Sequence, residues 1–191
     1  MRKGLFVFCI IAILVSCQNS DYSPKPRGYH RIDLPKKSYH SAATGCPYDF
    51  EIPSYAFLDD DIHQQSQTCW KNLKFPQFNA TLHISYFHIN SQATFAQLTE
   101  DARTFVFKHT SKASAIDQQT IRFEDRGIYG LQYEIKGNTA SNAQFYVSDS
   151  CTHYLRGALY FNEKPNVDSI QPVLNFIKQD IDHLLNTLTW K

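Results

Sequence analysis

The stretch YGLQYEIKGNTASNAQFYVSDSCTHYLRGALYF, residues 129–161, decides the fold because it holds three successive strand patterns. Its first part carries apolar side chains at every second position: Tyr129, Leu131, Tyr133 and Ile135. Such alternation predicts a β-strand. Residues 143–148 and 154–161 are also strand-like and carry aromatic side chains on both faces. Apolar residues on both faces indicate a sheet that is covered on both sides, at least in its middle.

One further strand and two helices are predicted around this stretch. Residues 80–86 alternate with period two, whereas two other segments follow helical spacing. In the first segment one face comprises Phe95, Leu98, Ala102, Phe105, Val106 and His109, with Ser91 or Thr94 as candidate N-cap. In the second, near residues 167–188, the apolar residues are Val167, Ile170, Leu174, Ile177, Ile181, Leu184 and Leu188. Because Pro172 fits only a first turn, we expect this helix to begin around Asp168 or Ser169.

The element order is strands, helix, four strands, helix, with no βαβ alternation. This order predicts an α+β fold with a mainly antiparallel sheet of about five to six strands and two principal flanking helices. The last helix has a heptad stripe that also occurs in coiled coils, but a helix docked on the sheet is the favoured interpretation. We expect one such domain over residues 46–191.

The first residues are typical of a secretory signal. Met1–Lys3 is basic, and the apolar run of residues 4–15 is too short to span a bilayer. Residues 14–17, Leu-Val-Ser-Cys, resemble a bacterial lipobox. We therefore expect a lipoprotein signal peptide over residues 1–16, cleavage between Ser16 and Cys17, and acyl chains on Cys17 as a membrane anchor. The alternative is an ordinary signal peptide with a chance cysteine.

Residues 17–45 are predicted to be a tether and an arm, in which Pro24 and Pro26 exclude a helix. Residues 25–37 hold Asp33 as their one acidic residue against five cations: Lys25, Arg27, Arg31, Lys36 and Lys37. Two interpretations stay open: the cations contact anionic lipid headgroups, or the arm is a solvated linker whose later half packs on the domain. The lack of an acidic run after Cys17 favours the periplasmic leaflet of the outer membrane.

Composition excludes several classes of protein. The 191 residues are 42% hydrophobic, which excludes a disordered chain, and 19 Lys and Arg against 18 Asp and Glu give no basic excess for nucleic acid. After cleavage and lipidation of Cys17, the remaining thiols are those of Cys46, Cys69 and Cys151. A Cys46–Cys69 bridge around a polar segment is favoured, and three buried free thiols are the alternative. Cys151, in a strand pattern, is expected to be a small buried apolar residue.

No catalytic residue, metal ligand or cofactor is assigned from the sequence. No C-x-x-C or H-x-x-x-H pair occurs, and His83 and His88 face opposite sides of their strand. Asp180 and His183 are expected to form an ordinary solvated pair on the last helix. Asp149 and Arg156 could pair across a hairpin. A hydrolase or ligand-binding module acting on the cell wall or on secreted substrates is the alternative to a docking protein.

Beyond these patterns, sequence blocks along nearly the whole mature chain resemble the gliding motility lipoprotein GldD family. They include residues 24–35, 46–53, 69–86, 108–110, 145–149, 155–161 and 165–173, and Asp180 to Trp190. The resemblance implies a cell-envelope lipoprotein that is needed for gliding and for the linked type IX secretion machinery, with other envelope proteins as partners. It carries over the lipidated position, Cys17, and the paired positions Cys46 and Cys69, but no catalytic residue. A looser similarity to the PsbP/Mog1-like α/β/α sandwich fits the element order and concerns the fold alone.

Overall fold

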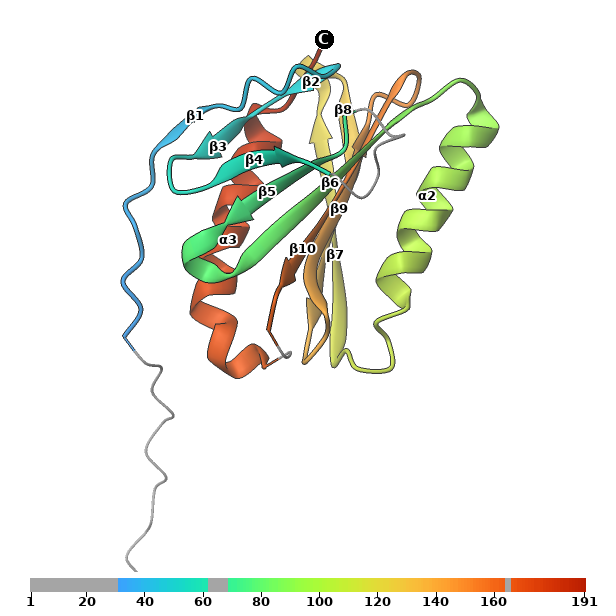
Figure 1. Ribbon diagram of the computed structural model, residues 1–191. Helices are drawn as coiled ribbons and strands as arrows, with labels where there is room; N and C mark the ends of the chain where they lie inside the picture. The colour runs from blue at the N-terminus through green and yellow to red at the C-terminus, as the bar shows by residue number, and fades with distance from the viewer. Residues whose placement is uncertain (1–30, 62–68, 164–165) are drawn as a thin grey trace, which may run out of the picture. The chain divides into compact units, whose positions relative to one another are not determined.

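Among residues 31–61, 69–163 and 166–191, which the computed structural model describes, seven antiparallel strands form the central sheet (Figure 1). In order across the sheet they are β4 (Phe57–Asp60), β5 (Lys71–Phe75), β6 (Ala80–His88), β10 (His153–Phe161), β9 (Ser141–Ser148), β8 (Ile128–Lys136) and β7 (Ala115–Phe123). The strands predicted at 80–86, 129–135, 143–148 and 154–161 are therefore confirmed as β6, β8, β9 and β10. The sheet is wider than the five to six strands expected, because short β4 and polar β7 extend its edges.

The middle of the sheet is the most buried part. Every residue of β9 is buried, as aromatic and apolar side chains on both faces of this segment predicted. Gly157 of β10 lies beside Phe145 of β9, and a Cβ at Gly157 would come within 2.3 Å of the Phe145 ring. Glycine is therefore required there for the ring to cross the neighbouring strand.

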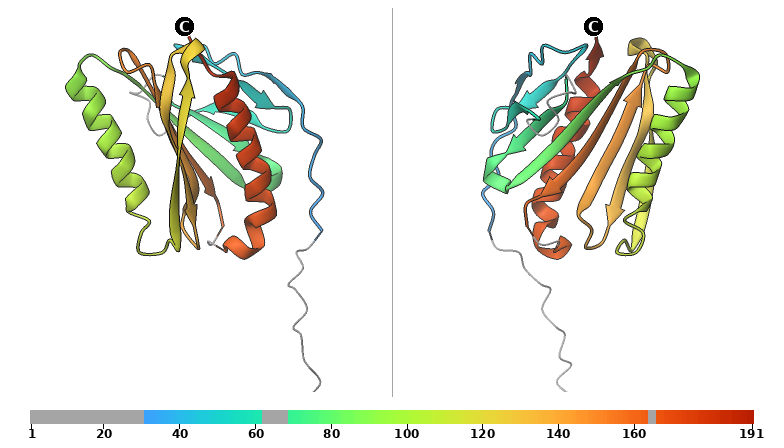
Figure 2. Two further views of the ribbon diagram at one scale, coloured as in Figure 1. Left: turned by 180° about the vertical axis from the view of Figure 1, so that it is seen from behind. Right: turned by 45° about the vertical axis from the view of Figure 1, so that its right-hand side comes forward.

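Two helices cover the two faces of this sheet (Figures 1 and 2). Helix α2 (Gln92–Phe107) begins after Ser91, whose Oγ accepts a hydrogen bond from the Thr94 N–H at 3.1 Å. Helix α3 (Val167–Thr187) buries a long stripe that comprises Val173, Leu174, Phe176, Ile177, Asp180, Ile181, Leu184 and Leu185. The α+β fold class, a mainly antiparallel sheet between two helices, is thus confirmed.

The helix predicted near residues 167–188 is confirmed as α3, which begins one residue before the expected Asp168. Its first residue is Val167, whose N–H donates to Asn138 Oδ1 at 2.8 Å. This contact with the β8–β9 turn satisfies one of the free N–H groups at the helix start. Pro172 consequently lies inside the helix, and the expectation that it belongs to the first turn was wrong.

Two small sheets complete the fold. In one, β1 (Tyr39–Ser41) pairs with β3 (Glu51–Pro53), and in the other, β2 (Tyr48–Asp49) pairs with β11 (Thr189–Trp190). Two short 3-10 helices, η2 (Pro76–Phe78) and η3 (Glu124–Arg126), precede β6 and β8. Since the compact unit comprises Asp33–Lys191, the sequence-based boundary at Cys46 was placed too late. The reason is the backbone pairing of β1, which the polar sequence of that arm does not reveal. No helix of the described residues is long and apolar enough to cross a membrane.

Cys46 and Cys69 form a disulfide with their Cα atoms 5.5 Å apart. Cys151 is a free, exposed cysteine, so the expectation that it is buried was wrong. Strand β9 ends at Ser148 because Asp149 Oδ1 accepts the N–H groups of the next turn, including that of Cys151 at 2.9 Å. This turn carries Cys151 out of the sheet.

Removal of the disulfide should destabilise the fold measurably. The bond closes a loop with a sequence separation of 23, for which the entropy of the unfolded chain gives about 3 kcal/mol. We expect the double variant Cys46→Ala/Cys69→Ala to lose about that much free energy of unfolding in urea titrations. Cys151→Ala, at the exposed cysteine, serves as the matched control. Free thiols at both positions in an unreduced peptide map would contradict the bridge.

Candidate functional site

The predicted membrane-surface residues do not share one environment. Ser16, Cys17, Lys25 and Arg27 lie outside the described residues. Arg31 and Lys36 are exposed. Lys37 is not available to a lipid headgroup, because its Nζ pairs with Asp180 Oδ1 at 2.5 Å and donates to the Phe176 carbonyl at 2.7 Å. The assignment of Lys37 to a membrane contact was therefore wrong.

Asp180 is the centre of a buried polar cluster on α3. Its side chain is 1% exposed, yet three donors from the arm and from the loop after β3 reach it. Besides Lys37, Tyr39 OH donates to Oδ1 at 2.9 Å and Tyr55 OH donates to Oδ2 at 2.6 Å. The Lys37 ammonium also lies 3.6 Å from the centre of the Phe176 ring. A buried carboxylate is tolerated where charge and hydrogen bonds compensate it, as they do here.

The two tyrosines report the low polarity around this carboxylate. Burial, with the hydrogen bond and the charge of Asp180, raises the pKa of Tyr39 to about 12, and the same causes raise the pKa of Tyr55. Tyr39 also stacks on the His183 ring at 3.6 Å, and His183 Nε2 lies 2.7 Å from Glu51 Oε2. The expected solvated Asp180–His183 pair is therefore wrong, since each has partners from the arm or from β3.

The role of this Asp180 cluster (Lys37, Tyr39, Tyr55 and Asp180) is to fasten the arm to the domain. Each carboxylate oxygen already accepts a phenol, and the ammonium takes the remaining strong position. Gln77 Nε2 adds a second fastening by donating to the Asp33 carbonyl at 2.8 Å. The arm between Asp33 and Ser41 is thus held on the α3 side of the sheet.

A second feature lies on α2, where two phenylalanines face solvent. Phe105 and Phe107 are 41% and 46% exposed, whereas Val106 between them is 1% exposed. Consecutive helix residues are turned by about 100°, so a Phe-Val-Phe triplet with valine inward directs both rings to the flanks. Phe105 was predicted on the buried face, and that prediction was wrong for this reason. The signal for the exposed pair was present in the triplet itself.

Cations lie against both exposed rings. Arg103 Cζ is 5.5 Å from the Phe107 ring centre, and Lys108 Nζ is 4.9 Å from that of Phe105. Arg156 of β10 lies 4.5 Å from the Phe105 ring centre. We define the α2 patch as Arg103, Phe105, Phe107, Lys108 and Arg156. Within the described part of the chain, neither Lys108 nor Arg156 has a carboxylate within ion-pair distance.

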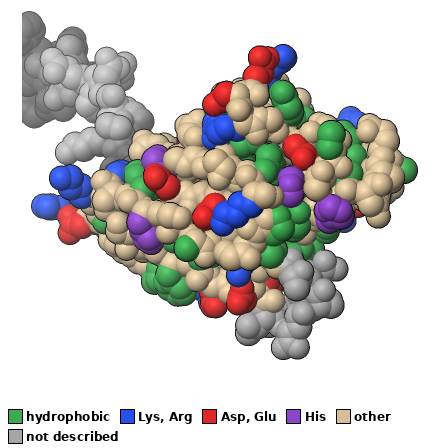
Figure 3. Space-filling model, turned by 90° about the horizontal axis from the view of Figure 1, so that it is seen from above, with side chains coloured by type: hydrophobic (Ala, Val, Ile, Leu, Met, Phe, Trp, Pro, Cys, Tyr) green, Lys and Arg blue, Asp and Glu red, His purple; other side chains and the backbone are tan. Residues whose placement is uncertain are grey.

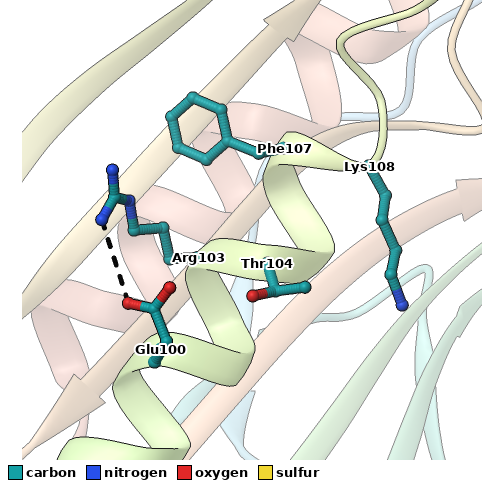
Figure 4. A pocket seen from close by; sticks show the side chains of 5 residues that line it. All are labelled: Glu100, Arg103, Thr104, Phe107 and Lys108. Carbon is teal, nitrogen blue, oxygen red and sulfur yellow. Dashed lines mark ion pairs between the residues drawn. The ribbon is translucent and has the colours of Figure 1, made fainter.

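The α2 patch borders a surface hollow of about 410 Å³ (Figure 4). Its lining residues are Glu100, Arg103, Thr104, Phe107 and Lys108. Arg103 Nη1 and Glu100 Oε2 are 3.9 Å apart at the rim, which is a long, exposed ion pair of little strength. The hollow can therefore accept a carboxylate or an aromatic side chain from outside without breaking a strong internal contact.

Arg156 is placed in this patch by the sheet, and it forms no ion pair among the described residues. It lies opposite Ser85 and Tyr146 in the register of β10, and burial lowers the pKa of its guanidinium. The suggested Asp149–Arg156 pair is absent among the described residues: Asp149 instead accepts backbone N–H groups in its own turn, including His153 N–H at 2.8 Å. Arg156 is thereby left for the aromatic ring of Phe105.

Acidic, basic and histidine side chains are interspersed on the end of the molecule seen in Figure 3. His83 Nδ1 lies 2.7 Å from Asn72 Oδ1. No group of three or more His, Cys, Asp and Glu side chains in the described ranges is arranged to hold a metal ion.

Comparisons with known proteins agree with the fold and give the family. The solution structure of cyanobacterial PsbP (CyanoP) from Synechocystis sp. is similar with a TM-score of 0.51 and 12% sequence identity, covering 85% of this chain and 98% of that chain. This likeness concerns the fold alone. A search of curated proteins gives no match. The family model described as gliding motility lipoprotein GldD matches residues 19–190. The chain therefore belongs to the gliding motility lipoprotein GldD family.

Proposed function

We propose that this gliding motility lipoprotein acts without catalysis, as a docking component of the gliding and type IX secretion machinery. In this proposal acyl chains on Cys17 hold it at the outer membrane, facing the periplasm, and the α2 patch binds another cell-envelope protein. The observation that carries the proposal is the pair of exposed phenylalanines beside two cations, Lys108 and Arg156, that form no ion pair within the described residues. No cofactor other than the covalent lipid takes part.

The chemistry of the α2 patch defines the partner surface. Aromatic residues and arginine dominate the binding energy of protein interfaces. Lys108 and Arg156 attract carboxylates, while the rings of Phe105 and Phe107 bury apolar area. The expected partner therefore presents acidic side chains around an apolar or aromatic centre.

The position of the arm supports the same view. The Asp180 cluster fixes the arm against α3, on the face of the sheet opposite to α2 (Figure 2). The described part of the arm, from Asp33 on, therefore lies away from the α2 patch. This arrangement leaves α2 uncovered by the arm and accessible to a partner.

Crosslinking in intact cells tests the proposal. A photo-crosslinking amino acid at Thr104, in the hollow, should yield an adduct with a single envelope protein. The double variant Phe105→Ala/Phe107→Ala should reduce that adduct about tenfold, which corresponds to about 1.4 kcal/mol. Phe57→Ala is the matched control, because Phe57 is 48% exposed and also lies under a lysine, yet belongs to β4. An adduct that survives the double variant unchanged, or the lack of any adduct, would count against docking through α2.

A further inference from the structure

The outer edge of β7 is a long, accessible strand edge. Strand β7 has nine residues, lies last in the sheet and, among the described residues, pairs only with β8. Its side chains are mostly exposed, with Ile121 as the buried exception. Figure 2 (left) shows β7 and β8, in yellow, between α2 and α3 with no other described element drawn over them. Such an edge presents a row of backbone N–H and C=O groups that are available to hydrogen-bond a further strand.

The opposite edge of the sheet is protected by contrast. Strand β4 has only four residues, and its Asp59 and Asp60 pair with Lys74 and Lys71 of β5. Short length and charge are the usual means by which proteins block the addition of a further strand. β7 has neither protection to the same degree: no proline interrupts it, and residues 118–121 (Gln-Gln-Thr-Ile) are uncharged.

A groove accompanies this edge on the α3 side. Two adjoining cavities of about 370 and 480 Å³ both reach Gln119, Gln132 and Asp182, and so lie between β7–β8 and α3. Two of the acidic groups in their walls have cationic partners: Lys178 Nζ lies 2.7 Å from Glu134 Oε2, and Lys136 Nζ lies 2.6 Å from Asp117 Oδ2. Asp182 accepts a hydrogen bond from Gln132 Nε2 at 2.9 Å and keeps its negative charge. The walls thus offer amide and carboxylate groups for hydrogen bonds.

We propose that β7 binds an extended segment of a partner protein as an additional strand. Only an extended chain matches a row of backbone groups along a strand edge, and every second side chain of such a segment would point toward α3. The two cavities would receive these side chains. Because their walls are polar and share the carboxylate of Asp182 as a hydrogen-bond acceptor, the segment carries side chains that donate hydrogen bonds, such as Ser, Thr, Asn and Gln, at those positions. This surface is separate from the α2 patch.

A second copy of the chain fits β7 less well. In a symmetric dimer, two β7 strands would pair antiparallel across a two-fold axis and form one continuous sheet. Residues directly opposite each other in that pair face the same side of the sheet, so their positions in the sequence differ by an even number. Asp117 and Arg122 face opposite sides and can never be opposite partners in such a pair. With Gln119 on the axis, Asp117 would lie opposite Ile121 and Arg122 opposite Ile116. The charge pattern therefore favours a different protein.

Amide hydrogen exchange tests this proposal directly. The full-length protein is compared in isolated envelope membranes and as purified protein in detergent, with exchange quenched before capture and digestion. In the purified protein the outward amides of β7, about half of the strand, should exchange fast. In envelopes their exchange should slow at least about tenfold, while the β4 segment stays unchanged. Equal β7 exchange in the two preparations would overturn the proposal, and so would protection that rises with protein concentration after purification, since it indicates a second copy.

Variants separate strand addition from a general loss of structure. The backbone N–H groups of Gln118 and Gln119 point to opposite edges of β7. A proline at one of these positions therefore removes an outward-facing donor, and a proline at the other breaks the β7–β8 ladder; the two variants are Gln118→Pro and Gln119→Pro. The variant that keeps the wild-type melting temperature should lose the envelope-specific protection. Gln119→Lys, which alters the groove without touching the backbone, should reduce it too. Retained protection in either folded variant would overturn the proposal. Phe105→Ala/Phe107→Ala should leave β7 protection intact, which keeps this test independent of the α2 patch.

Discussion

Asp180→Ala is expected to lower the free energy of unfolding by about 3 kcal/mol. The substitution leaves the Lys37 ammonium and two tyrosine hydroxyls without the acceptor that they share. Hydrogen bonds to a charged group contribute about 1.5–3 kcal/mol each, and breaking a buried pair leaves a charge uncompensated. Lys37 is 25% exposed and regains part of its hydration, which keeps the expected loss near the lower end of the roughly 3–5 kcal/mol that breaking a buried ion pair costs. Urea denaturation followed by circular dichroism measures the loss.

Asp182→Ala is the matched control for this prediction. Asp182 lies two residues further along α3, is exposed, and accepts one hydrogen bond from Gln132. Its removal should cost about 0.5 kcal/mol or less. If both aspartate variants lose the same amount, the Asp180 cluster does not fasten the arm in the way described.

The two tyrosines make the stability of the Asp180 cluster depend on pH in the alkaline range. The pKa of Tyr39 is raised from 10.0 to about 12, and that of Tyr55 is raised as well. A raised pKa in the folded state gives a stabilisation that is complete below the unfolded pKa of 10 and is lost as the pH rises through 12. The wild-type protein should therefore lose stability between pH 10 and 12. Asp180→Ala should lose less over that interval, because one cause of the raised pKa values is then missing.

Cys17→Ser is expected to release the protein from the membrane almost completely. The expectation follows from the lipobox-like end of the signal and from the family to which the chain belongs. Two or three acyl chains give stable anchoring, at about 0.8 kcal/mol per buried CH₂, and none of these chains can form on serine. Cells fed with labelled palmitate should label the wild type and not the variant, which should move from the membrane pellet to the soluble fraction.

Two controls narrow the interpretation of that result. Cys151→Ser changes an exposed cysteine of the domain and should keep both the label and the pellet location. Cys9→Ser changes a cysteine upstream of the predicted cleavage point and should do the same. A Cys17→Ser protein that stays labelled, or just as membrane-bound, contradicts the anchor on Cys17.

The fold could be predicted to a large extent because buried strand and helix faces produce a periodic pattern of apolar residues in the sequence. Residues 143–148 are apolar or aromatic on both faces, and β9 is indeed buried throughout. The stripe of residues 167–188 likewise became α3. Strand β7 was not assigned to particular residues, although four strands were expected after the first helix, because Gln118, Gln119 and Thr120 interrupt the alternation and only Ile121 is buried. The sheet has seven strands and not the expected five to six because of its edge strands, β4 and β7.

The candidate site was harder to predict because its residues meet across long sequence distances. Lys37 and Asp180 are 143 positions apart, and nothing in the basic stretch around Lys37 distinguishes the lysine that pairs from Lys36, which is exposed. Asp180 interrupts the apolar stripe of its helix. This interruption is the one local sign in the sequence that its charge has a partner in the fold. Phe105 and Phe107 could have been identified from the helical turn alone.

The arm fastened by β1 and Asp180 also determines how the molecule would respond to tension. A lipid on Cys17 would transmit any drag between the bilayer and a moving envelope complex into the chain ahead of Asp33. That load meets the three-residue ladder of β1 and the Lys37 ion pair before it reaches the seven-stranded sheet. The arm is therefore the part that would detach first. Its release would lengthen the tether between bilayer and domain while the sheet stays folded.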